Sequence, residues 1–204
     1  MTVAGRGASL FSLPADGRRP EPGWQHRCTR DPEAIGRMLA TGANLGTGCR
    51  ASGVVVLDLD RHKDQADGVA RFATELAARE QAWPDTLTTR TPNRGLHLYF
   101  QVPAGATVGS ASGVRSPLGE GIDVRGPGRR SGGYVLAPGS VLAGRPYLIE
   151  HDAPIAELPA WLAALLATPS RPVPARSKLS PRWRTPIPHV SHTPQWDCHE
   201  KSHG

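Results

Sequence analysis

An apolar run that ends in two aspartates, VVVLDLD at residues 54–60, constrains this chain more than any other segment. A short run of β-branched and aliphatic residues is typical of a buried strand. Side chains two apart on a strand point to the same face, so Asp58 and Asp60 should project together from its end. Two carboxylates held this close repel each other unless a cation or a basic group lies between them. The pair therefore predicts a site for a hard divalent ion such as Mg²⁺, and it suggests phosphoryl or nucleotidyl chemistry.

The remaining chain combines several short strand-like segments with a few helical ones. A helix is predicted over 68–80, where apolar residues recur at helical spacing. Two strand-like runs, 87–91 and 96–102, flank the turn-forming sequence of residues 92–95 and predict a hairpin. Further strands are expected at 8–13, 122–125, 134–137 and 147–149, and further helices start near Asp31 and Pro159. Because one βα step is followed by hairpins, the pattern predicts an α+β fold with a mixed or mostly antiparallel sheet.

Local patterns also predict helix caps and buried faces. Asp31 and Asp67 are each placed to cap a helix N-terminus. On the strand at 96–101, alternation predicts that His97, Tyr99 and Gln101 face away from the core. In the last helix, four side chains are expected to face the core, namely Trp161, Leu162, Leu165 and Leu166.

Length and charge divide the chain into two parts. The first 168 of the 204 residues are long enough for one domain with a hydrophobic core, so we predict a domain over 1–168. Seven prolines in 169–204 rule out regular structure there, and this Pro-rich basic segment is expected to be a disordered tail. The tail carries +4 of the net charge of +6. The charge is therefore no proof that the folded part binds nucleic acid.

Targeting signals and cysteine patterns are missing from the sequence. No apolar stretch is long enough to cross a bilayer, and residues 1–11 lack the apolar core of a signal peptide. Cys28, Cys49 and Cys198 are scattered and fit neither a disulfide framework nor a zinc knuckle. We therefore expect a cytoplasmic protein with reduced thiols and no membrane partner.

Two later segments carry side chains that suit phosphate or metal binding. His97 follows a Gly-containing turn with Arg94 at its mouth, a combination suited to cradle a phosphate. In GIDVRG, residues 121–126, Asp123 and Arg125 share one face of a short strand. They form either a local ion pair, worth about 0–1 kcal/mol if exposed, or a third metal carboxylate beside a phosphate-binding arginine. Three acids, a histidine and arginines are the set that nucleotidyl transfer by two metal ions requires.

Four motifs in this order, VVVLDLD, TPNRGLHLYF, GIDVRG and GGYVLAPGSV, resemble the N-terminal bifunctional DNA primase/polymerase (prim-pol) domain of the archaeo-eukaryotic primase superfamily. The segments TRDPEAI and GANLGTG are similar to its usual lead-in, and the resemblance covers residues 8–166. It implies an RRM-like catalytic sheet with packed helices and a small N-terminal α/β unit. It also implies that Asp58, Asp60 and Asp123 bind the catalytic metals, Mg²⁺ or Mn²⁺. By the same resemblance, His97 contacts the phosphates of the incoming nucleotide, with Arg125 near the triphosphate. The Arg94 turn, predicted above as a phosphate cradle, adds a further nucleotide-binding residue.

The activity implied is template-directed primer synthesis on single-stranded DNA from NTPs or dNTPs, in replication of a chromosome, plasmid, phage or integrated element. The chain contains no GxxxxGK[ST] phosphate loop, so a separate helicase is the expected partner. The alternative is a truncated, inactive remnant that binds single-stranded DNA or nucleotides as a replication accessory.

Other enzymes with a DxD pair fit less of the sequence. A metal-dependent glycosyltransferase leaves His97 and Asp123 unexplained. A haloacid-dehalogenase-like phosphatase needs a small hydroxyl residue after the pair, whereas Arg61 follows here.

Overall fold

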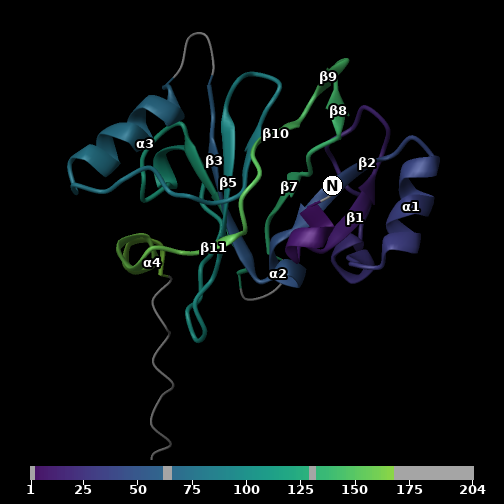
Figure 1. The fold of residues 1–204 in the computed structure, drawn as a ribbon, viewed down its shortest axis with the longest axis horizontal. Coiled ribbons are helices and arrows are strands. Elements are labelled where there is room, and N and C mark those ends of the chain that lie inside the picture. The colour runs from purple at the N-terminus through teal and green to yellow at the C-terminus, as the bar shows by residue number, and fades with distance from the viewer. Residues whose placement is uncertain (1–2, 62–65, 129–131, 168–204) are drawn as a thin grey trace, which may run out of the picture. The chain divides into compact units, whose positions relative to one another are not determined.

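The computed structural model describes residues 3–61, 66–128 and 132–167 (Figure 1), and the predicted tail at 169–204 lies outside them. The α-helices and 3₁₀ helices (η) are η1 (Val3–Arg6), η2 (Trp24–Arg27), α1 (Pro32–Ala40), α2 (Cys49–Ser52), α3 (Gly68–Ala77), η3 (Gly113–Arg115) and α4 (Ala160–Leu166). The strands are β1 (Leu10–Leu13), β2 (Asn44–Gly48), β3 (Val54–Leu59), β4 (Thr88–Arg90), β5 (Leu96–Gln101), β6 (Ile122–Arg125), β7 (Tyr134–Leu136), β8 (Val141–Leu142), β9 (Arg145–Pro146), β10 (Leu148–His151) and β11 (Ala156–Glu157). Across these ranges, every helix is too short or too polar to cross a bilayer.

The strands form two main sheets. The central sheet has the order β10-β4-β5-β3-β6 with antiparallel neighbours, and β11 adds a short parallel pair to β5. The second sheet is antiparallel, with the order β1-β2-β7, and β8 and β9 form a separate small hairpin. The pairing of β4 with β5 confirms the hairpin predicted around residues 92–95. Helices combined with mostly antiparallel sheets confirm the predicted α+β class.

Both faces of the central sheet are covered. Figure 1 shows α3 and α4 on one side of β3 and β5, and the second sheet with α1 on the other. On the α3 and α4 side, Val55 and Leu57 of β3 pack with Phe72 and Leu162. On the opposite side, Val54, Val56 and Tyr99 pack with residues of the N-terminal segments that include Leu10, Ile35 and Leu45. Alternate residues of β3 therefore belong to two different cores, and Asp58 continues the face of Val54 and Val56.

Both helix caps predicted from the sequence are present, whereas two side chains do not face the side that the sequence predicted. The Asp31 side chain accepts hydrogen bonds from the Glu33 and Ala34 amides, and the Asp67 side chain accepts one from Ala70. Both predicted caps are thus confirmed, although α3 ends three residues earlier than the predicted Glu80. The prediction that Leu165 faces the core is wrong, because α4 leaves it 37% exposed while it buries Leu162 and Leu166.

The second sheet explains the other difference. Tyr99 was predicted to face away from the core, yet it is fully buried, because the second sheet covers that face of β5. Strand β2 of this sheet was not predicted, since its sequence NLGTG lacks a run of β-branched residues. Its first residue, Asn44, donates to the carbonyl oxygens of Gly17 and Val141 and accepts from the Val141 amide. These contacts are tertiary, so the local pattern did not reveal them.

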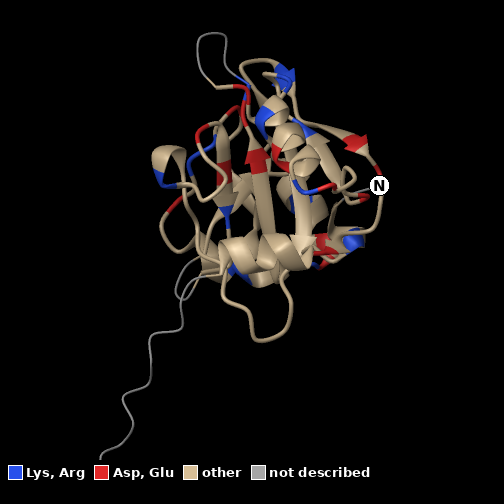
Figure 2. Cartoon of the chain, turned by 90° about the vertical axis from the view of Figure 1, so that its left-hand side faces the viewer, with Lys and Arg blue, Asp and Glu red and all other residues tan. Residues whose placement is uncertain are grey.

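Charged residues of both signs are spread over the described part of the chain. Figure 2 shows Lys and Arg interspersed with Asp and Glu on this face, without a broad area of one sign. This distribution agrees with the small net charge of residues 1–168, which contain 18 basic and 16 acidic residues. The overall charge of this part of the chain therefore marks no nucleic-acid surface, and any such site depends on a local group of residues.

Candidate active site

Asp58 lies near the end of β3, where strand pairing on both sides brings other polar residues beside it. Asp58 is directly opposite His97 on β5 and Asp123 on β6. Side chains at opposed positions of antiparallel strands leave the same face, with Cβ atoms about 4.5–5.5 Å apart. Asp60 follows just past the end of β3 and leaves by the same face. The register therefore gathers four residues that are far apart in the chain.

Three of these residues form an acidic group. Carboxylate oxygens of Asp58, Asp60 and Asp123 lie within 4.8 Å of one another. Such a group favours a bound cation, because the ion relieves the repulsion among the carboxylates. Hard divalent ions prefer carboxylate oxygens, so this set of donors fits Mg²⁺ or Mn²⁺. The acidic group could therefore hold a metal ion.

His97 is held between the acidic group and an aromatic ring. Its Nε2 lies 3.3 Å from Oδ1 of Asp58, and its ring centroid lies 5.7 Å from that of Tyr147. Burial raises the pKa of Tyr147, and the negative charge of Asp58 raises it further. The Tyr147 phenol is therefore a neutral hydrogen-bond donor at neutral pH. His97 was predicted on a face away from the core, but its side chain is only 5% exposed and lies against the Tyr147 ring.

Asp123 is oriented by two hydrogen bonds. Its Oδ1 accepts from the Gly113 amide at 3.0 Å, and its Oδ2 accepts from Nη2 of Arg125 at 2.6 Å. The local Asp–Arg ion pair considered from the sequence is thus present. Each carboxylate oxygen offers two lone pairs, so these contacts leave acceptor capacity for a cation. The ion pair and a metal-binding role are therefore compatible.

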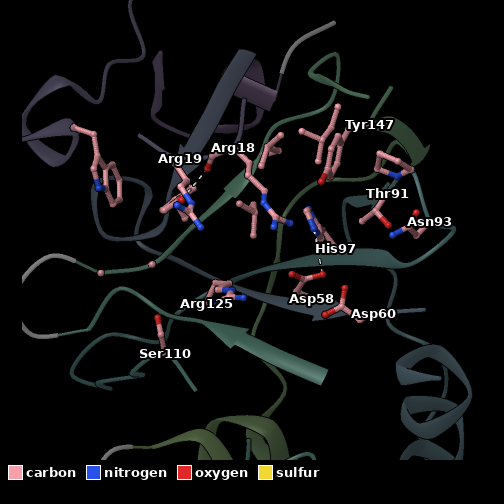
Figure 3. Close-up of a pocket in the computed structure, with 18 of the residues that line it drawn as sticks. Arg18, Arg19, Asp58, Asp60, Thr91, Asn93, His97, Ser110, Arg125 and Tyr147 are labelled. Carbon is pink, nitrogen blue, oxygen red and sulfur yellow. Dashed lines mark hydrogen bonds and ion pairs between the residues drawn. The ribbon is translucent and has the colours of Figure 1, made fainter. Parts of the chain in front are cut away.

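A cavity of about 700 Å³ lies in front of the acidic group, and both sheets line it (Figure 3). Four of the predicted site residues, Asp58, Asp60, His97 and Arg125, are among its lining residues. Asp123 and Arg94 are not. The structure therefore brings most of the predicted residues to one cavity and leaves Arg94 apart.

Arg94 occupies the exposed turn of the β4–β5 hairpin, in a left-handed conformation with φ of 66°. Residues 91–93 of the same turn line the cavity instead. The following residue must be small, because a Cβ on Gly95 would lie 2.4 Å from the carbonyl oxygen of Leu59. The hairpin turn thus packs against the end of the strand that carries the aspartates.

Several cavity residues belong to segments without a recognisable site motif. Arg18 and Arg19 lie on the wall contributed by the N-terminal part of the chain (Figure 3), and the Arg18 carbonyl accepts a hydrogen bond from the Tyr134 hydroxyl at 2.9 Å. Arg145 donates from Nη1 to Oδ1 of Asn93 at 3.0 Å. The doubled arginine at 18–19 was the sole local hint, and nothing in its neighbourhood indicates that it faces the acidic group.

The residues that match a known protein family include both sheets. The family model described as bifunctional DNA primase/polymerase, N-terminal (Prim-Pol), matches residues 1–161. The chain belongs to this family. A comparison with curated proteins found no match.

Membership of the Prim-Pol family confirms the resemblance predicted from the four motifs. The matched residues include every predicted site residue and end within α4. The family implies nucleotidyltransferase activity in general, with nucleic acid and nucleotides as substrates and metal ions as cofactors. The acidic group of this Prim-Pol domain is compatible with that chemistry.

Proposed function

We propose that this Prim-Pol domain joins nucleotides on a single-stranded DNA template by two-metal-ion catalysis, and so makes or extends an RNA or DNA primer. The observation that carries the proposal is the group of three carboxylates within 4.8 Å of one another, beside a cavity of about 700 Å³. That volume falls in the range of small-molecule sites, about 300–1,000 Å³. A nucleotide and its metal ions could therefore share this space.

Asp58, Asp60 and Asp123 would hold Mg²⁺ or Mn²⁺ in this site. Bound divalent ions supply charge stabilisation for the attacking and the leaving oxygen of a phosphoryl transfer. Asp58 lies on β3, which is buried on both faces. The Asp60 backbone is held by hydrogen bonds, because its amide donates to the Gly121 carbonyl oxygen and its carbonyl oxygen accepts from the Gly68 amide. The Gly113 amide and Arg125 orient Asp123. The protein's part is therefore to hold three carboxylates in place before the substrate arrives.

Cationic and hydrogen-bonding side chains around the cavity suit the phosphates of an incoming nucleotide. We assign His97 and Arg125 to these phosphates, and Arg18 and Arg19 of the N-terminal wall lie on the same cavity. A guanidinium group can bind a phosphate through two parallel hydrogen bonds. We also assign Arg94, which lies on an exposed turn, to a phosphate of the nucleotide, and we expect it to contribute less to nucleotide binding than Arg125. Arg125→Ala should therefore raise the KM for nucleotide more than Arg94→Ala does.

We place the catalytic unit at residues 1–168 and assign the basic segment 169–204 a nonspecific contact with the DNA backbone. A helicase encoded separately would open duplex DNA during replication of the chromosome, plasmid, phage or integrated element concerned.

The deciding experiment is primer synthesis and extension on single-stranded DNA, with labelled NTPs or dNTPs and with Mg²⁺ or Mn²⁺. The double variant Asp58→Ala plus Asp60→Ala should incorporate no nucleotide. Asp85→Ala is the matched control, because Asp85 is an exposed carboxylate paired with His151 and does not line the cavity. Undiminished incorporation by the double variant would refute the mechanism. Binding of single-stranded DNA without any incorporation by the wild type would indicate a replication accessory in place of an enzyme.

A further inference from the structure

The cavity has a second polar end, opposite the arginines that the proposed function assigns to phosphates. Figure 3 shows Arg18, Arg19 and Arg125 on one side of the aspartates, and Thr91 and Asn93 on the other. A transfer by two metal ions takes place at the α-phosphate, beside the carboxylates. The diphosphate leaves from one oxygen of that phosphate and the sugar is attached through another, so the two extend in different directions. With the diphosphate among the arginines, the sugar lies at the end that contains Asn93.

Arg145 fixes the orientation of the Asn93 side chain. Nη1 of Arg145 donates to Oδ1 of Asn93 at 3.0 Å and to the carbonyl oxygen of Pro92 at 3.3 Å. A guanidinium group has only donors, so the Asn93 amide must turn its oxygen towards it. The NH₂ group of the amide is thereby left for another acceptor. Since Asn93 lines the cavity, a ligand in the cavity can supply that acceptor.

The turn that carries Asn93 is held in place by contacts on two sides. The Thr91 amide donates to the Gly95 carbonyl oxygen at 2.9 Å, and Gly95 packs against the carbonyl oxygen of Leu59. Arg145 lies on β9, so its contact ties the turn to a separate hairpin at the same cavity. The Asn93 amide therefore needs little reordering to bind a ligand.

Tyr147 supplies a second uncharged group at this end of the cavity. It lines the cavity two residues after Arg145. Burial raises the pKa of its hydroxyl, and the negative charges of Asp58 and Asp60 raise it further. At neutral pH this hydroxyl is uncharged and can donate or accept a hydrogen bond. An uncharged amide and an uncharged hydroxyl suit a sugar hydroxyl, whereas a phosphate forms its strong hydrogen bonds with charged donors.

We propose that Asn93, together with the Tyr147 hydroxyl, binds a hydroxyl group of the nucleotide's sugar, and that Arg145 is a positioning residue that orients the Asn93 amide. This subsite rests on the proposed function, because the place of the sugar follows from phosphates bound on the other side of the aspartates. The sugar hydroxyl accepts from the NH₂ group of Asn93. The 2′-hydroxyl and the 3′-hydroxyl share this chemistry, and nucleotides that lack one or the other distinguish them.

Isothermal titration calorimetry of the full chain with ATP, 2′-deoxy-ATP and 3′-deoxy-ATP, each with Mg²⁺ and without template, tests the subsite without reference to turnover. The wild type should bind ATP about two- to tenfold more tightly than the analogue that lacks the bound hydroxyl, the worth of one neutral hydrogen bond. Weaker binding of 2′-deoxy-ATP alone would identify the 2′-hydroxyl, and the chain would then favour NTPs over dNTPs. Weaker binding of 3′-deoxy-ATP alone would identify the 3′-hydroxyl. Equal affinity for all three nucleotides, or no affinity for any, would overturn the subsite.

Two substitutions of Asn93 separate a contact with the sugar from a structural role in the turn. Asn93→Ala and Asn93→Asp should both bring the ratio of affinities for ATP and the deoxy analogue close to one. Asn93→Asp keeps an oxygen for Arg145 and loses the N–H donors, so a residue that merely held the turn would keep the wild-type ratio in this variant. The added charge acts on every nucleotide alike and cancels in the ratio. Arg90→Ala is the matched control and should keep the ratio, because Arg90 precedes the same turn, pairs with Glu150 and does not line the cavity.

The positioning role of Arg145 has its own test in the same ratio. Arg145→Met removes the donors and lets the Asn93 amide rotate, so it should lower the ratio, whereas Arg145→Lys keeps a donor and should restore most of it. In an Asn93→Ala background, Arg145→Met should have no further effect on the ratio. An unchanged ratio in Arg145→Met, with or without an equal loss of affinity for all three nucleotides, would overturn the positioning role.

The primer-synthesis assay separates the subsite from the proposed function. Hydroxyl-dependent binding that Asn93→Asp abolishes, in a chain that incorporates no nucleotide, would refute the polymerase activity and support the subsite. Normal incorporation with equal affinity for the three nucleotides would refute the subsite alone.

Discussion

Neutralising one carboxylate of the acidic group should remove most of the stabilisation that divalent cations give to the fold. Asp60→Asn keeps the size of the side chain and removes one of three negative charges. With oxygens no more than 4.8 Å apart, each pair of carboxylates repels by at least about 3.5 kcal/mol at an effective dielectric constant of about 20. The wild-type group contains three such pairs and the variant contains one. A bound cation therefore has much less repulsion to relieve in Asp60→Asn.

The expected change in melting temperature follows from linkage. A ligand that binds only the folded state stabilises it by about 2.7 kcal/mol at about 100 times its Kd. For a domain of this size, 1 kcal/mol shifts the Tm by about 2–4 °C. Mg²⁺ or Mn²⁺ at that level should raise the Tm of the wild type by about 5–11 °C. The same ion concentration should raise the Tm of Asp60→Asn by less than half as much.

Differential scanning calorimetry of chelator-treated protein, with and without each ion, measures this shift. Asp85→Asn is the control and should keep the full shift, because it removes a carboxylate that does not line the cavity. Equal shifts in the wild type and in Asp60→Asn would refute the reasoning, since the ions would then bind elsewhere.

Three further predictions concern the fold. Phe72 is a fully buried residue of α3, so Phe72→Ala should lower the free energy of unfolding by about 3–5 kcal/mol in urea denaturation. A loss below about 1 kcal/mol would contradict its place in the core. Asp67→Ala removes the cap that accepts from the Ala70 amide and should cost about 0.5–2 kcal/mol at neutral pH. That hydrogen bond lowers the pKa of Asp67. The loss of unfolding free energy in Asp67→Ala should therefore be complete above the unfolded pKa of about 4 and shrink as the pH falls below it. A loss that does not depend on pH would contradict this origin. Burial raises the pKa of Cys49 to about 12, so its thiol should not react with iodoacetamide in the native protein. Peptide mass spectrometry should find Cys49 unmodified in native protein and alkylated in denatured protein. Fast alkylation of the native protein would show that Cys49 is accessible.

The first carboxylate pair and the helix caps could be predicted because they depend on residues close together in the chain. Asp58 and Asp60 share a face through the two-residue period of a strand. Asp31 and Asp67 cap helices that begin at the next residue. Backbone geometry alone relates such residues, whatever packs against them. The resemblance to known prim-pol motifs then linked these residues to the later His97 and Asp123.

Other parts of the site could not be predicted because they depend on what packs on the central sheet. Tyr99 is buried because β2 and its neighbours cover its face, and the buried His97 lies against the Tyr147 ring. The strand β2 itself has no strong local pattern, and tertiary contacts of Asn44 hold it in place. Arg18 and Arg19 line the cavity through tertiary packing as well, because they come from a segment far from the aspartates in the chain. No periodicity in the chain predicts a contact between separate sheets.

The sequence by itself determined that two carboxylates leave one face at the end of a buried strand, because alternation along a strand is a property of the backbone. The tertiary structure decided which residues stand beside them. The register that sets Asp58 between His97 and Asp123, and the second sheet that closes the cavity, depend on pairing between distant segments. Such pairing is selected by the burial of whole faces, so it is settled only when the chain packs as a unit.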